Sequence, residues 1–200
     1  DLLYDTVESA GANSSNTGAM VPAGVQVGLG VNAGSVYRIT DQGSLTNTDN
    51  DFDVAIEGQG WFRVQLPNGN DAYTRAGNFS LSPEGQIVTT DGYVVQPAIA
   101  IPQEARAVEI NTEGQVQVLL DGQAEAQIVG QFELVSFAND AGLEAIGGNL
   151  LLETAASGAP NVGVAGQPGF GTIRQGWVES SNVDAVTEIT SLIQAQRAYE

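Results

Sequence analysis

The sequence contains no cysteine, no histidine and no lysine in its 200 residues. Without cysteine there are no disulfides, no thiol nucleophiles and no zinc sites of the usual kind. Without histidine the commonest general base near neutral pH is missing. Catalysis by Ser–His–Asp or Cys–His groups is therefore excluded, and an enzyme of this sequence would depend on carboxylates, hydroxyls and arginine. The absence of cysteine suits both a reducing cytosol and an exported protein, so it does not place the compartment.

Positive charge is also scarce. Six arginines stand against 24 acidic residues, which gives a formal net charge of −18. No basic face can form, so a nucleic-acid backbone or an anionic membrane surface would repel this protein. We therefore expect neither nucleic-acid binding nor membrane insertion.

The chain has no apolar run long enough for a signal peptide or a membrane span. It begins at Asp1 rather than at Met, and it stops at Glu200 inside a predicted helix. We expect that both ends have been cut from a longer protein.

What remains is typical of a globular protein, because 42% of the residues are hydrophobic. A single domain of this length buries roughly 70% of the surface of its unfolded chain. Residues 1–10 (DLLYDTVESA) predict a short helix with Leu2, Leu3 and Val7 on one side. Gly11 to Ser35 shows no helical or strand period and predicts an extended segment or loop.

The middle of the chain predicts an antiparallel β domain. Short β-branched and aromatic runs lie between residues 52 and 137, and some alternate with a period of two. Between them lie dipeptides that end in glycine, which supplies the positive φ that a tight turn needs. The runs are 52–57, 61–66, 79–82, 86–90, 93–96 and 115–120, and the turns are at Asn68-Gly69, Glu84-Gly85, Asp91-Gly92, Glu113-Gly114 and Asp121-Gly122.

The C-terminal segment predicts a helix. Ser181 or Asn182 could cap it, and Asp184 would lie in its first turn. An apolar stripe at three- and four-residue steps follows, formed by Val183, Val186, Ile189 and Ile193. We expect this stripe to pack on Leu2, Leu3 and Val7, which would make a short helical base from both ends of the chain.

The predicted organisation has three parts: residues 1–45 (helix and extended segment), 46–156 (β domain) and 157–200. The last part contains a connector rich in glycine and proline, Ser157 to Gly176, before the helix. The fold class is therefore mainly β with a short helical base.

The acidic triplet Asp49, Asp51 and Asp53 has the spacing that opens an EF-hand calcium loop. The sixth position of that loop is Val54 rather than glycine, and the twelfth is Gly60 rather than glutamate. We therefore interpret the triplet as a turn rich in Asx residues before a strand.

Other candidate sites are equally incomplete. Gly28-Leu29-Gly30 with Gly34 lacks the strand–helix unit of a dinucleotide fold, and Gly58-Gln59-Gly60 leads into a strand, so it predicts a turn or bulge. Trp61 and Trp177 could stack on a sugar, but core packing is favoured by their apolar surroundings. A catalytic carboxylate pair cannot be identified from sequence. We predict no catalytic, cofactor-binding or metal residues, and a protein that is not an enzyme.

Three ordered groups of residues resemble the bacterial flagellar rod and hook proteins over essentially the whole chain. The first contains Asp53 to Ile56, Gly58 and Gly60 to Phe62, then Tyr73 to Phe79, Gly85, Val88-Thr89, Gly92 and Val95-Gln96. The second is Phe137 to Leu143 with Ser157 to Pro160, and the third is Gln175 to Val183 with Gln196 to Glu200.

Within the family the resemblance is closest to the subunits of the distal rod, because of Asp1 to Tyr4 and Gly18 to Gly30. The sequence differs from the family at Trp61, where phenylalanine is usual. It also lacks the family's N-terminal helix and the rest of the C-terminal helix, which form the coiled-coil inner tube.

The resemblance implies a structural subunit that assembles helically with copies of itself into a rigid hollow shaft carrying torque from motor to hook. It implies export through the flagellar system without a cleaved signal peptide, a location in the basal body where the rod crosses the periplasm, and no cofactor. The implied partners are proximal rod proteins, the hook protein and the rings around the shaft.

Two alternatives remain at this point. Inside the family, the chain could be a hook or proximal rod protein, although Gly18 to Gly30 argues against the hook. Outside it, a carbohydrate-acting enzyme or a surface adhesin on a β scaffold would also fit. The sequences flanking the chain would discriminate: a rod protein requires amphipathic helices before Asp1 and after Glu200, and an adhesin requires a signal peptide.

Overall fold

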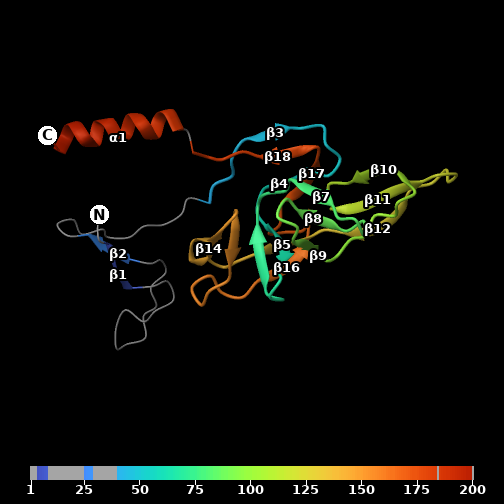
Figure 1. Cartoon of the computed structure of the whole chain (residues 1–200), viewed down its shortest axis with the longest axis horizontal. Helices are drawn as coiled ribbons and strands as arrows, with labels where there is room; N and C mark the ends of the chain where they lie inside the picture. Colours follow the sequence, from blue (N-terminus) through green and yellow to red (C-terminus); the bar gives the residue numbers. More distant parts are fainter. Residues whose placement is uncertain (1–3, 9–24, 29–39, 184, 200) are drawn as a thin grey trace.

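The computed structural model describes residues 4–8, 25–28, 40–183 and 185–199. These residues form mainly antiparallel strands, with one α-helix near the C-terminus (Figure 1). The predicted mainly β fold class is confirmed.

Most of the β domain is built on one nine-stranded sheet. Its central strand β5 pairs with β6 and β9, and β13 also joins β5 and carries β16 on its other edge. The path through the sheet is β14-β15-β6-β5-β9-β8-β7. The strands are β5 (Trp61–Gln65), β6 (Asp71–Thr74), β7 (Phe79–Leu81), β8 (Ile87–Thr89), β9 (Val94–Gln96), β13 (Glu133–Ser136), β14 (Glu144–Gly147), β15 (Leu150–Leu152) and β16 (Asn161–Val164).

A separate three-stranded sheet contains β10 (Ala105–Ile110), β11 (Gln115–Leu120) and β12 (Gln127–Gln131). It projects from the end of the β domain opposite the C-terminal helix (Figure 1). Val116 and Val118 are both fully buried, because every second residue of β11 points to the core. The predicted period of two is confirmed here.

Two shorter ladders join the beginning and the end of the β domain. β4 (Val54–Glu57) pairs with β17 (Thr172–Gln175), and β3 (Leu45–Asn47) pairs with β18 (Trp177–Glu179). The prediction that Ser157 to Gly176 is only a connector is wrong, because this segment contains β16 and β17. Its glycines serve close packing instead: a Cβ on Gly171 would meet the carbonyl group of Glu57.

The division of the chain into residues 1–45, 46–156 and 157–200 stays a prediction.

The main core is formed by side chains from nearly every strand. At its centre Phe62 meets Phe79 and Phe132 edge to face, with ring centroids 5.1 and 5.9 Å apart. A smaller cluster contains Trp61, Tyr73, Val135, Leu143 and Leu151. Leu143 directly follows a single 3₁₀ turn, η1 (Asp140–Gly142).

The smaller cluster shifts the titration of one phenol. Tyr73 is 2% exposed, and its ring meets Phe137 edge to face at 4.8 Å. Burial, followed by the negative charges of Glu153 and Asp71, raises the pKa of Tyr73 above its usual 10.0. The neutral phenol is therefore the form that the fold favours.

The predicted turns are confirmed. The glycines of the five dipeptides have φ between 80° and 87° (Gly69 84°, Gly85 80°, Gly92 87°, Gly114 81°, Gly122 82°), in the left-handed region that other residues avoid. Gly58 and Gly60, with φ of 109° and 132°, turn the chain from β4 into β5, so the turn interpretation of this triplet is also confirmed.

The predicted N-terminal helix is wrong. Residues Tyr4–Glu8 form strand β1, which pairs antiparallel with β2 (Val25–Gly28). Tyr4, Thr6 and Val7 are aromatic or β-branched, and a partner strand is available in the segment predicted as loop, so strand pairing prevails over the weak helical period. Leu2, Leu3 and most of Gly11 to Ser35 lie outside the described residues.

Candidate assembly surface

The C-terminal helix α1 (Ala185–Tyr199) confirms the predicted helix, but its apolar side is open to solvent. Val186 is 73% exposed, Ile189 57% and Ile193 45%. The prediction that these residues are buried against the N-terminal segment is therefore wrong. Leu192, which the sequence analysis missed, is 62% exposed and widens the same stripe. We call Val186, Ile189, Leu192 and Ile193 the apolar face of α1.

A helix with such a face is incomplete on its own. Fifteen residues are marginal for a stable helix in water, and most helical stability comes from burying one face against another element. α1 extends away from the β domain, so the strands do not cover it (Figure 1). The apolar face is therefore a surface that can be buried by another helix.

The segment that leads into α1 is fixed to the β domain by the pairing of β3 with β18. We call this two-stranded ladder (Leu45–Asn47 and Trp177–Glu179) the clasp. Beyond it, the Ser180 amide donates to the Ser44 carbonyl at 2.8 Å, and the Asn182 side chain donates to the Asp41 carbonyl at 2.8 Å. Ser181 accepts a hydrogen bond from the Val183 amide at 3.1 Å, while Asp184 lies outside the described residues. The chain segments that enter and leave the β domain are thus bound side by side.

Arg75 locks the clasp to the main sheet. Its Nε donates to Glu179 Oε2 at 2.8 Å, and the two side chains are only 17% and 12% exposed. The other oxygen of Glu179 accepts the Gly43 amide at 2.9 Å. The remaining guanidinium nitrogens donate to the carbonyls of Ile56, Gly58 and Gly60. The Arg75–Glu179 ion pair therefore ties together β18, the segment before β3 and the β4–β5 turn.

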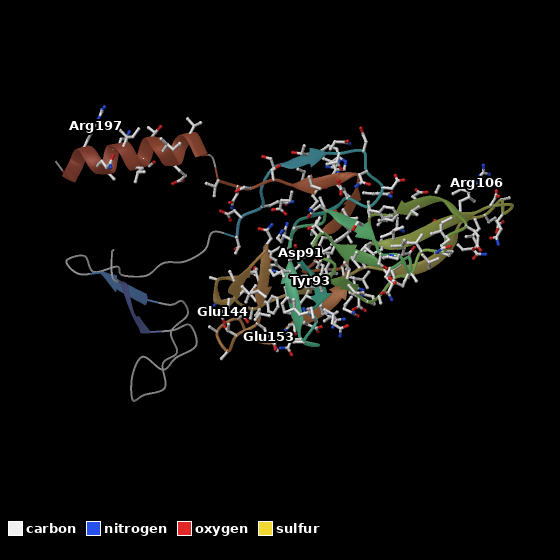
Figure 2. The ribbon with its side chains drawn as sticks, viewed as in Figure 1. Asp91, Tyr93, Arg106, Glu144, Glu153 and Arg197 are labelled. Carbon is white, nitrogen blue, oxygen red and sulfur yellow. The ribbon has the colours of Figure 1, made fainter. Side chains whose placement is uncertain are left out.

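An open groove of about 620 Å³ lies between the clasp and the β14–β15 hairpin. Trp61 and Arg75 line it, with the guanidinium carbon 5.9 Å from the indole centroid. Trp61 is 8% exposed, and its Nε1 donates to Asp140 Oδ1 at 3.2 Å. Figure 2 shows acidic Glu144 and Glu153 around this end of the domain.

The structure confirms the Asx-rich turn at Asp49 to Asp53. Asn47 Oδ1 accepts the Asp49 amide at 3.0 Å, and Asn50 donates its side-chain amide to Asp53 Oδ1 at 3.1 Å. In the part of the chain that the structure describes, no three Asp or Glu side chains come close enough to hold a metal ion. The prediction of no site residues stays a prediction.

The tryptophans differ in their packing. The predicted core packing of Trp61 is confirmed, whereas Trp177 is half-buried with the Arg174 guanidinium 4.7 Å from its ring centroid. Gly28 ends β2, and Leu29, Gly30 and Gly34 lie outside the described residues. None of the helices in the described ranges is long and apolar enough to cross a membrane.

The β domain thus carries an apolar helix that is fixed at one end and exposed along its length. A structural subunit that packs on other chains has this architecture. The sequence matches two family models of structural proteins. Residues 55–118 match the flagellar hook protein FlgE/F/G D1 domain, and residues 174–200 match the flagellar basal body rod FlgEFG protein C-terminal family.

Similar proteins cover the whole chain. It is 61% identical over 200 residues to the flagellar basal-body rod protein FlgG of Caulobacter vibrioides, and 47% identical over 200 residues to that of Agrobacterium fabrum. Each match includes 100% of this chain and 76% of the relative. The flagellar basal-body rod protein FlgF of Caulobacter vibrioides is 37% identical over 169 residues, 82% of this chain and 64% of the relative. The chain therefore belongs to the FlgG family of flagellar basal-body rod proteins, the structural subunits of the distal rod.

Proposed function

We propose that copies of this protein stack helically into a hollow, rigid shaft that carries torque from the motor to the hook. The observation that supports this most directly is the apolar face of α1, with Ile189, Leu192 and Ile193 between 45% and 62% exposed. Burying three large apolar side chains by about half each would stabilise a contact between neighbouring helices by a few kcal/mol, at roughly 25 cal/mol per Å². Repeated along a filament, such contacts hold the inner tube together.

The β domain forms the outer layer of the shaft. Its strands are joined into a core around Phe62, and Arg75 fixes this core to the clasp from which α1 leaves. Torque that reaches one subunit through its helix therefore passes into the β domain through several hydrogen bonds at once. A stiff connection of this kind is what a drive shaft requires.

The remaining parts of the proposal come from the family. The partners are proximal rod proteins, the hook protein and the surrounding rings, and the location is the basal body where the rod crosses the periplasm. The subunits are exported through the flagellar system without a cleaved signal peptide. A mechanical role requires no catalytic site, which agrees with a chain that has neither histidine nor cysteine.

The test uses the full-length protein in a strain that lacks its own copy. Ile189→Asn places a polar amide on the apolar face, whereas the control Ser191→Asn places it on the opposite side of α1, two residues further on. We expect Ile189→Asn to abolish swimming and complete rods in electron micrographs of basal bodies, while Ser191→Asn supports both. Both purified variants should melt within a few degrees of the parent, since both sites are exposed. Normal rods with Ile189→Asn would overturn the proposal.

A further inference from the structure

The two charged side chains of α1 lie on opposite flanks of its apolar face. Glu188 and Arg197 are nine residues apart, and each residue turns a helix by about 100°, so their directions differ by about half a turn. Ile189, Leu192 and Ile193 point between them, and each charge lies about 90° from the middle of that face. One flank of the helix is therefore acidic and the other is basic.

Arg197 differs from the arginines of the β domain. Arg63, Arg75, Arg106 and Arg174 each form an ion pair with a carboxylate of the same chain. Arg197 is exposed and forms no ion pair with any residue that the structure describes, and Figure 2 shows it projecting from α1 away from the β domain. Among the arginines that the structure describes, Arg197 is therefore the exception, in a chain of net charge −18.

We propose that Arg197 of one copy pairs with Glu188 of the next copy when their α1 helices pack in parallel. This inference rests on the proposed function, and it specifies how the helices are arranged. The basic flank of each helix meets the acidic flank of its neighbour, so the contact is head to tail and can repeat without closing. The neighbour is displaced along the helix axis by about nine residues, or roughly 13.5 Å. The charges thus fix the order and the axial offset of helices that the apolar face alone would leave free to slide.

A second explanation makes the opposite prediction. Glu188 lies in the first turn of α1 and Arg197 in the last, where each also complements the helix dipole. If this were their whole role, reversing both charges would harm the helix more than reversing one. If they pair between copies, the double reversal restores an ion pair with its sign exchanged, because each flank then again meets its opposite.

The experiment compares E188R, R197E and the double variant E188R/R197E in the full-length protein, scored by the fraction of swimming cells and by complete rods in isolated basal bodies. We expect each single reversal to reduce both by roughly tenfold or more, because like charges then face each other. The double reversal should recover at least about half of the parent level. The matched control is Arg106→Glu, an exposed charge on β10 whose reversal should leave swimming unchanged.

Two outcomes would overturn the pairing. Single reversals that swim like the parent would show that the charges do not meet, and a double variant no better than the worse single one would assign them to the helix dipole. Circular dichroism of the purified chains measures the dipole effect separately. Ile189→Asn distinguishes this failure from that of the proposed function: if it abolishes rods while the reversals do not, the helices assemble without this ion pair.

Discussion

Replacing Arg75 with methionine should be among the most damaging single changes on the surface of the β domain. Methionine keeps much of the aliphatic length but removes the charge and all five N–H donors. Glu179, 12% exposed, would lose its ion-pair partner, and three backbone carbonyls would lose the donor that now reaches them. Removing one partner of a buried ion pair costs about 3–5 kcal/mol, and partial solvent access places Arg75→Met near the lower end, about 3 kcal/mol.

The matched control is Arg106→Met. Arg106 also pairs with a carboxylate, Asp121, but the two side chains are 69% and 76% exposed and the atoms lie 3.4 Å apart. Surface pairs of this kind contribute about 0–1 kcal/mol, so this variant should differ from the parent by less than about 1 kcal/mol. The comparison separates the effect of burial from that of losing an arginine.

Urea denaturation followed by tryptophan fluorescence measures both free energies of unfolding. In a double-mutant cycle, Arg75→Met with Glu179→Met should cost less than the sum of the single changes by about 1–3 kcal/mol, because the double variant leaves no unpaired buried charge. If Arg75→Met costs no more than Arg106→Met, then Arg75 does not lock the clasp.

Three further predictions test other parts of the fold. Ile189→Ala should change the free energy of unfolding of the isolated chain by less than about 1 kcal/mol, since Ile189 is 57% exposed, and a larger loss in urea would show that α1 packs on the protein. Gly77→Ala should reduce the free energy of unfolding by about 2 kcal/mol or more, because the new methyl group overlaps the Val54 carbonyl. Its control, Gly122→Ala, has open space around the new methyl group and should lose only about 1 kcal/mol, because of the positive φ at this position. Calorimetric melting of the two variants compares these losses. Burial raises the pKa of Tyr73, so its contribution to stability is complete below pH 10.0 and is lost at higher pH, because the unfolded phenol ionises first. Tyr73→Phe should therefore flatten the fall in stability above pH 10.0, measured by urea denaturation, and an unchanged slope would contradict this.

The turns could be predicted from sequence because each depends on one local requirement. A glycine with φ near 80° after Asn, Asp or Glu is specified by two residues, and all five dipeptides are turns in the structure. The strands between them follow for the same reason, since their pattern of period two is local. The pairing of strands was not predictable in this way. Strand β4 pairs with β17, more than a hundred residues further along the chain, and the local sequence of neither strand indicates which strand it pairs with.

The errors have the same origin. The period of residues 1–10 fits a short helix, but a strand partner at Val25–Gly28 decides the outcome. The helical spacing of apolar residues in α1 predicts an apolar face, but it does not indicate which element packs on that face. For Arg75, the only signal was its place within the Tyr73 to Phe79 motif, because an isolated arginine carries no pattern that reveals its four acceptors, on Glu179, Ile56, Gly58 and Gly60.

The clasp also determines how the protein would respond to a pulling force. In its register Leu45 lies opposite Glu179, and the chain enters and leaves the β domain at this same end. A force that separates the two leaving segments would therefore peel β3 from β18 one pair at a time, the geometry in which a ladder is weakest. The hydrogen bonds from the Gly43 amide to Glu179 and from Asn182 to the Asp41 carbonyl join the two segments where peeling would begin. Peeling of β3 from β18 therefore cannot start until these bonds break.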